Sequence, residues 1–162
     1  MIYYEYMNIT HQKEIYFYAG GYNAFSNFSA FQVLYNGFTY ATLEHAYQTM
    51  RFTDTAIQKE IQEATSPLEA QKIARAYAQD GKERTDWHEI NMDLMKELHH
   101  LRFQQHEYLK EKLLQSGESL LVHKAPEGST PSGGFWGVDE KGNGENHLGK
   151  ILMELRAMYR QD

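Results

Sequence analysis

The chain of 162 residues contains no cysteine, which excludes disulfide bonds and thiolate chemistry. It also lacks an apolar run of membrane length and an N-terminal leader in which basic residues precede a short apolar stretch. These absences predict a cytoplasmic protein without a membrane partner. Basic residues are few, 16 lysines and arginines against 22 acidic residues, and the net charge of −6 argues against broad binding along a nucleic-acid backbone.

Several signature motifs are missing as well. The sequence has no serine nucleophile elbow, no phosphate-binding glycine loop and no dinucleotide fingerprint. Its 8 histidines do not form a metal-binding pattern. The adjacent His99 and His100 point in different directions on a helix, and no acidic partner follows at ligand spacing. We therefore expect neither a metal nor a cofactor.

What is present fits one globular domain over residues 1–162, with a core at about 14–160. Aromatic residues are abundant, with 12 tyrosines and 8 phenylalanines that can fill a core or stack on a flat heterocycle. Asn36-Gly37 between two short apolar runs predicts a β-hairpin. Ser66 and Asp86 are predicted to cap helices. The patterns predict strands at 14–19, 32–35, 38–41 and 119–123, and helices from about 42, at 54–64, 66–80, from 86, at 106–115 and at 148–160.

These elements indicate an α+β fold, mostly helical, with a small β-sheet or hairpin. The long stretch rich in glycine and proline at 125–146 is predicted to be a functional loop, because loops of this length are uncommon in compact domains unless they carry function.

The most informative pattern is a polar stripe on an apolar helix. Glu44, Gln48 and Arg51 are spaced i, i+4 and i+7, so they project from one helical face. Charged groups in such a segment must find partners or face a cavity. Glu44 could activate water or offset positive charge on a sugar, or it could be a buried anchor bonded to Gln48. Arg51 could bind a phosphate, or could neutralise Glu44 in a structural ion pair.

Aromatic and amide residues elsewhere are candidates for substrate binding. Asn27, beside Phe28 in a turn-like segment, could read a base edge or ribose, although asparagine in turns more often bonds its own backbone. Trp87 could stack on a heterocycle, but packing in the core is favoured. Trp136 is a better stacking candidate because it lies in a glycine-rich loop, where Gly137 permits close approach of a ligand.

The start of the last helix offers a second group of candidates. Asn146 is predicted to cap this helix, whose free amide groups, near Gly149, could attract a phosphate. Arg156 lies apart from the apolar stripe of the helix. It could pair with an acid or a phosphate, or remain a solvated surface charge.

Taken in order, these segments resemble the NADAR family, which includes the YbiA-type N-glycosidases. The resemblance covers residues 14–160, nearly the whole chain. The matching segments are Phe17-Tyr18, Ser26-Asn27-Phe28, Glu44-His45-Ala46-Tyr47-Gln48, Ser66-Pro67 with Ala70, Trp87, Met95, Phe103, Trp136-Gly137 and Asn146-x-Leu148-Gly149-Lys150-x-Leu152-Met153-x-Leu155-Arg156.

The resemblance implies the family's compact α+β fold and an enzyme that hydrolyses N-glycosidic bonds. The substrates it implies are ribosylamino-pyrimidine phosphates of early riboflavin synthesis, or ADP-ribose attached to guanine, including a modified guanine in nucleic acid. Both carry a ribose C1–N bond beside a phosphate and a flat heterocycle. Breaking that bond develops positive charge on the sugar, which an anionic Glu44 would stabilise.

Two positions depart from the family pattern. Where members commonly carry lysine, whose amine could attack the anomeric carbon, this chain has Arg51, which is too basic for that role. The acid often found directly after Trp-Gly is Val138 here, with Asp139 one residue later. Three hypotheses follow: an N-glycosidase in which Glu44 and Arg51 are catalytic, a non-catalytic module that binds ADP-ribose or a nucleotide, and a structural or interaction domain.

Overall fold

The computed structural model describes residues 13–17, 20–124 and 132–161. Their fold is mostly helical with short strands, so the predicted α+β class is confirmed. In chain order the elements are β1 (Glu14–Tyr16), the 3-10 helix η1 (Gly20–Phe25), β2 (Val33–Tyr35), β3 (Phe38–Tyr40), α1 (Leu43–Met50), α2 (Thr55–Gln62), α3 (Pro67–Gln79), α4 (Trp87–Gln105), α5 (Glu107–Gln115), β4 (Leu120–Val122), α6 (Ser132–Trp136) and α7 (His147–Tyr159).

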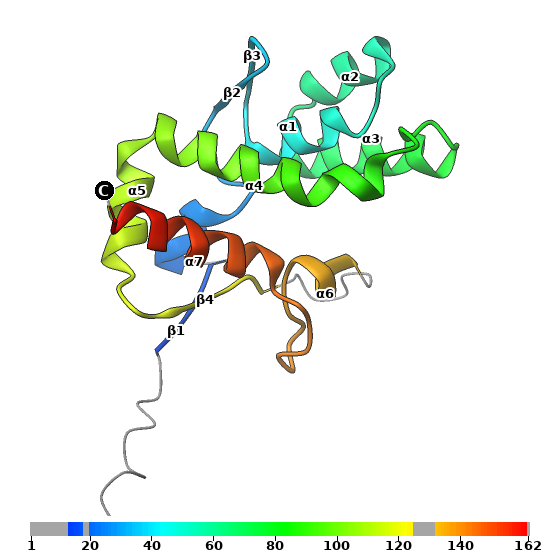
Figure 1. Cartoon of the computed structure of the whole chain (residues 1–162). Coiled ribbons are helices and arrows are strands. Elements are labelled where there is room, and N and C mark those ends of the chain that lie inside the picture. The colour runs from blue at the N-terminus through cyan, green and yellow to red at the C-terminus, as the bar shows by residue number, and fades with distance from the viewer. Residues whose placement is uncertain (1–12, 18–19, 125–131, 162) are drawn as a thin grey trace, which may run out of the picture.

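The long helix α4 lies across the centre of the molecule (Figure 1). Helices α1, α2 and α3 and the β2–β3 hairpin lie on one side of it, and α7 lies on the other, with α5 at its C-terminal end. Helix α4 contacts α1, β2, α5 and α7, and α7 also packs on β4. The central position of α4 allows its side chains to reach both halves of the structure.

The two small sheets form in different ways. Strands β2 and β3 make the predicted antiparallel hairpin, in which Asn36 (φ 50°) and Gly37 (φ 81°) occupy the left-handed region that this type of turn requires. Strands β1 and β4 instead pair in parallel, with Ile15 opposite Leu121. Because β1 and β4 are far apart in sequence, no local pattern predicts this second pairing.

Helix starts follow the capping rules at some positions and not at others. The predicted cap at Ser66 is confirmed, since its hydroxyl accepts the Glu69 N–H at 3.1 Å. Asp86 also stands at the N-cap position of α4, as predicted, but its side chain makes no capping hydrogen bond. Both of its carboxylate oxygens accept hydrogen bonds from the guanidinium of Arg84, at 2.6 and 2.9 Å, so this salt bridge competes successfully with the free amides of the helix.

The predicted long loop at 125–146 is only partly a loop. Residues 132–136 form the short helix α6, which the glycine-rich sequence did not indicate. Pro126, Gly128 and Pro131 of the predicted loop, and Tyr18 at the end of the predicted first strand, lie outside the described residues. The 3-10 helix at 20–25 was also not predicted.

Asn146 stands at the N-cap position of α7, as predicted, but its side chain does not cap the helix. It adopts a left-handed conformation (φ 52°), and its side chain hydrogen-bonds the adjacent backbone at β4 instead of the helix. Its Oδ1 accepts the His123 N–H and its Nδ2 donates to the Leu121 carbonyl, both at 2.9 Å. Asn146 thus replaces a strand partner along β4, and this explains why an amide side chain is required at this position.

We expect Gly149→Ala to lower the free energy of unfolding by about 1–3 kcal/mol, because overpacking a tight contact costs this much. A Cβ at Gly149 would lie 2.1 Å from the Leu121 carbonyl oxygen and 2.4 Å from the Asn146 amide nitrogen. Gly134→Ala is the matched control, since a Cβ there meets no atom within 4 Å. Urea denaturation of both variants measures the difference. Equal midpoints would contradict tight packing of α7 on β4.

No helix in the described part of the chain is long and apolar enough to span a membrane. Within residues 13–17, 20–124 and 132–161, no three histidine, aspartate or glutamate side chains come together as metal ligands.

Candidate active site

Glu44, near the start of α1, is a carboxylate surrounded by amides. Its side chain is 5% exposed, and its Oε1 accepts hydrogen bonds from Gln48 Nε2 at 2.8 Å and Gln71 Nε2 at 3.3 Å. The hydrogen bond to Gln48, part of one of the two interpretations of Glu44, is present. Burial raises the pKa of Glu44 above the ordinary carboxyl value, while the hydrogen bonds of Gln48, Asn27 and Gln71 and the charge of Arg51 oppose the rise. The ionised form is a strengthened base.

Asn27 reaches Glu44 from the turn that precedes the hairpin. Its carbonyl accepts the Glu44 N–H at 3.1 Å, which satisfies one of the amides left free at the start of α1. Its side-chain Nδ2 donates to the Met95 sulfur on α4 at 3.6 Å, and its amide opposes the rise in the pKa of Glu44. The favoured interpretation, a local bond of Asn27 to its own backbone, is therefore wrong. Phe28 beside it is only half-buried.

Two amide oxygens near this carboxylate lack a partner. Gln48 Oε1 and Asn27 Oδ1 are buried and accept no hydrogen bond within the described residues. Unsatisfied buried acceptors cost free energy, about 1–3 kcal/mol each. They are therefore suited to a ligand that brings hydroxyl or amino donors.

Arg102 on α4 holds the turn that carries Asn27. Its side chain is fully buried, and its guanidinium donates to the carbonyls of Ser26 at 2.8 Å and Phe25 at 2.9 Å. A further bond joins it to the Ser29 hydroxyl at 3.3 Å. Within the described residues it has no carboxylate partner. Burial lowers the pKa of Arg102 to about 9, still above neutral pH, so the cation persists.

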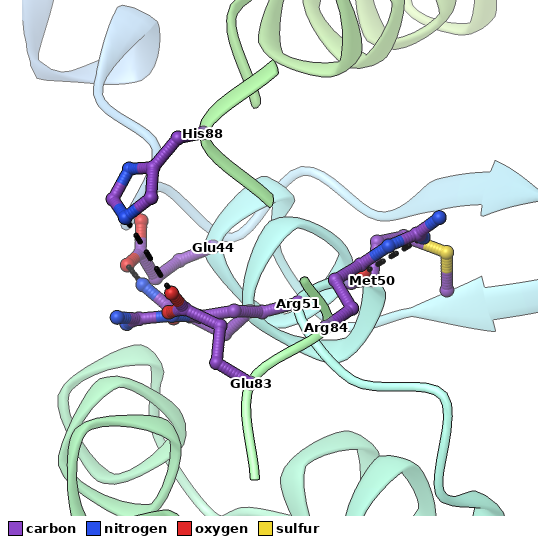
Figure 2. Close-up of polar contacts among 7 residues, drawn as sticks. Glu44, Met50, Arg51, Glu83, Arg84 and His88 are labelled. Carbon is purple, nitrogen blue, oxygen red and sulfur yellow. Dashed lines mark hydrogen bonds and ion pairs between the residues drawn. The ribbon is translucent and has the colours of Figure 1, made fainter. Parts of the chain in front are cut away.

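Arg51 follows the last residue of α1 and pairs with Glu83, not with Glu44. Its Nε donates to a Glu83 carboxylate oxygen, and Glu83 also lies 3.8 Å from His88 Nε2 (Figure 2). The interpretation that Arg51 neutralises Glu44 in a direct ion pair is therefore wrong. Its charge still acts on Glu44 through space. The guanidinium carbon lies 5.9 Å from the ring centre of Trp87, within cation–π range.

Three aromatic rings lie beside the polar stripe. Tyr47 on α1 is 4.9 Å from Trp87 and 5.9 Å from Trp136, measured between ring centres. Trp87 is 4% exposed, which confirms the favoured core packing, whereas Trp136 on α6 is partly buried. Burial, and secondarily the nearby Glu44 carboxylate, raise the pKa of Tyr47, so its phenol stays neutral.

The residues after Trp136 serve the fold. A Cβ at Gly137 would lie 2.3 Å from the His123 carbonyl oxygen, so the close approach that glycine permits here is to the protein's own backbone. Val138 is buried and donates its N–H to the same carbonyl at 2.8 Å. Asp139 is exposed and accepts the N–H groups of Lys141 and Asn143, so it orders its own turn.

Arg156 is brought to a different place from Glu44. It is 5% exposed and donates to the Ser116 hydroxyl at 2.8 Å, next to the end of α5. The interpretation of Arg156 as a solvated surface charge is therefore wrong. Asn146 and Gly149 pack against β4, as described above. The structure thus groups Asn27, Gln48, Arg51, Trp87 and Trp136 near Glu44. The N–H of Asn146 donates to the Gly137 carbonyl at 3.2 Å, next to Trp136, whereas Arg156 lies apart at the end of α5.

Sequence reasoning missed two residues of this group, Gln71 and Glu83. Gln71 lies on α3 between the buried Ala70 and Ala74, where no periodicity distinguishes it from a surface amide. Glu83 belongs to a short charged loop of a kind usually solvated. His45, inside the matching motif, instead bridges Thr42 and the Ala64 carbonyl, at 2.8 and 3.1 Å, and so fixes α1 to the end of α2.

One hollow lies on the opposite face of α3 from Gln71 and includes none of the predicted site residues. It lies between α2 and α3 and is lined by Glu60, Lys72, Ile73, Ala76, Tyr77 and Asp80.

A buried carboxylate among amides, with a paired arginine and aromatic rings beside it, is an arrangement that can accept a proton and contact a ligand with a flat ring. The NADAR domain model matches residues 16–160, and the chain belongs to this family. N-glycosidase Npun_R5314 of Nostoc punctiforme is 36% identical over 151 residues, which are 90% of this chain and 92% of the relative.

Two further relatives and one solved structure are also similar to the chain. N-glycosidase YbiA of Escherichia coli is 33% identical over 135 residues, 83% of this chain and 80% of that protein. The NMR structure of Escherichia coli YbiA superposes with a TM-score of 0.79 at 31% identity, covering 93% of this chain and 86% of that one, so the predicted fold family is confirmed. The chloroplastic riboflavin biosynthesis protein PYRR of Zea mays is 36% identical over 149 residues, 84% of this chain but 23% of that protein.

Proposed function

We propose that this protein is an N-glycosidase that hydrolyses the ribose C1–N bond of a phosphorylated N-riboside. The observation that carries the proposal is Glu44, a buried carboxylate held by Gln48 and Gln71 next to two unsatisfied amide oxygens. The names of the N-glycosidase relatives support the same class of reaction.

Glu44 acts at the ribose. Loss of the base leaves positive charge on the sugar ring, and an anionic carboxylate in a poorly hydrated site stabilises that charge strongly. The same carboxylate accepts a proton from the attacking water, for which its strengthened basicity is an advantage. The amides of Gln48 and Gln71 fix its orientation, while the free oxygens of Gln48 and Asn27 accept hydrogen bonds from the ribose hydroxyls.

The remaining groups bind the ends of the substrate. Trp136, with Phe28, stacks on the heterocycle. Trp87 contacts the Arg51 guanidinium as a cation–π partner. Arg51 binds a phosphate oxygen and places positive charge near the reaction. The α7 residues Asn146, Gly149 and Arg156 make contacts within the fold, so the proposal rests on the group around Glu44.

The proposal is tested by incubating the protein with a ribosylamino-pyrimidine phosphate and, separately, with ADP-ribosylated guanosine, and following the released base by mass spectrometry. We expect release from at least one of these substrates. Calorimetric binding of ADP-ribose without release from either would instead favour a binding module, the function suggested by Arg51 in place of lysine. If the protein neither bound ADP-ribose nor released a base, both functions would be contradicted.

A further inference from the structure

Glu83, in the loop between α3 and α4, is a second carboxylate beside the stripe. Its side chain is 19% exposed, and it holds Arg51 through the Nε atom. Figure 2 shows Glu83, Arg51 and Glu44 close together. The Nη atoms of Arg51 donate to no group within residues 13–17, 20–124 and 132–161, and the Arg51 side chain is 25% exposed. Glu83 therefore binds one edge of the guanidinium and leaves the terminal nitrogens free.

The loop that carries Glu83 is fastened to the end of α1. The N–H of Arg84 donates to the Arg51 carbonyl at 3.1 Å, and Arg84 Nη1 donates to the Met50 carbonyl at 3.4 Å. These carbonyls belong to the last turn of α1, which leaves acceptors free and attracts cations. Asp86 holds the Arg84 guanidinium in turn. Glu83 is thus placed beside Arg51 by its neighbour in the chain, and the ion pair is preorganised.

A carboxylate in this position determines what chemistry position 51 can perform. An opposite charge within an ion pair favours the protonated form of a basic side chain, and a protonated group cannot attack carbon. Arginine is in any case too basic to act as a nucleophile. The pair therefore retains a fixed cation for binding and removes position 51 as an attacking group.

We propose that Glu83 is a positioning residue that holds Arg51 as a fixed cation, so that water, and not the side chain at position 51, attacks the ribose. The inference rests on the proposed function. In the step, the water oxygen bonds to C1 while the C1–N bond breaks, and the electron pair of the broken bond stays on the base nitrogen. One water proton passes to Glu44, and the released base takes a proton from solvent.

The test compares Arg51→Lys with the double variant Arg51→Lys/Glu83→Gln. The titratable groups around Arg51 are Glu44 and Tyr47 on α1 and Glu83 in the loop, with His88 Nε2 3.8 Å from Glu83. We expect the introduced lysine amine to titrate at a pH about 1 or more lower in the double variant, because the opposing charge of Glu83 is gone. Carbon NMR of lysine-labelled protein measures this without any turnover. Borohydride is expected to trap a ribose adduct in the double variant at neutral pH and not in the single one.

Two further variants complete the comparison. Glu83→Gln alone is expected to lower kcat/KM about tenfold, mainly through KM, because Arg51 loses its orientation. Glu63→Gln is the matched control. It removes an exposed partner of Lys59, 3.8 Å away on α2, and should leave kcat/KM unchanged. If circular dichroism reports misfolding of Glu83→Gln, Glu83→Asp, which keeps the charge but shortens the reach of the carboxylate, tests the orientation of Arg51 through the same rise in KM.

The inference would be overturned if the amine titrated at the same pH with and without Glu83, or if borohydride trapped an adduct equally in both variants. In that case the unmodified protein would still release base. Failure of the proposed function has a different signature. The unmodified protein would release no base from either substrate, whereas the NMR comparison would still report whether Glu83 acts on position 51.

Discussion

Glu44→Gln is expected to lower kcat for base release between about 100-fold and 10,000-fold while the protein stays folded. Glutamine has nearly the same shape and keeps an oxygen for the amides of Gln48 and Gln71. It can neither take a proton from water nor offset positive charge on the sugar. Glu111→Gln, on the exposed surface of α5, is the control and should retain full activity. Mass-spectrometric assay of released base measures both, and unchanged turnover by the Glu44 variant would refute the assignment.

The pH dependence gives a second readout for the same carboxyl group. Because the pKa of Glu44 is raised, base release by the unmodified protein should fall as pH drops through a range above that of an ordinary carboxyl. For stability the sign is opposite. Because the pKa of Glu44 is higher in the folded than in the unfolded protein, this carboxyl group stabilises the fold fully at pH values below its unfolded-state pKa. That stabilisation is lost as the pH rises through its folded-state pKa. Glutamine stays neutral, so Glu44→Gln should become more stable relative to the unmodified protein as the pH rises through the pKa of Glu44.

Arg102→Met is expected to lower the free energy of unfolding by about 2–5 kcal/mol, because each buried carbonyl left without a donor costs about 1–3 kcal/mol. The carbonyls of Phe25 and Ser26 both lose their donors, and this loss exceeds the gain from no longer burying a cation. The turn carrying Asn27 then loosens, so kcat for base release should also fall. Urea denaturation and the base-release assay measure the two effects.

Arg75→Met serves as the control for this variant. It makes the same substitution at an exposed position of α3 and should change stability by less than about 0.5 kcal/mol. Similar unfolding midpoints for the two variants would show that Arg102 does not hold the turn. Loss of stability with unchanged kcat would separate its role in folding from the site at Glu44.

Local chemistry made part of this structure predictable. Asn36-Gly37 can form the hairpin turn with little strain, and Ser66 with Glu69 satisfies free amides at a helix start, so short windows of sequence were sufficient. Asp86 and Asn146 are also residue types that cap helices and stand at helix starts. The side chain of each, however, hydrogen-bonds a partner outside the helix, which competes with capping. That competition depends on tertiary neighbours, which no short window contains.

The site followed the same division. The spacing of Glu44 and Gln48 predicted their contact, because both lie on consecutive turns of one helix. The partners from other elements were not predictable, since Gln71 and Glu83 reach the stripe only after α3 and the following loop pack against α1. The sequence offered Glu44 as the acid that Arg51 could neutralise, whereas the structure pairs Arg51 with Glu83.

The parallel pairing of β1 with β4 has a consequence for synthesis on the ribosome. β1 emerges long before β4, and until then its hydrogen-bonding edge has no partner, a state that favours association with other chains. A product that stops before Leu120 would keep that edge open permanently. Such truncated products should therefore aggregate, even though they contain every residue of the α1 stripe.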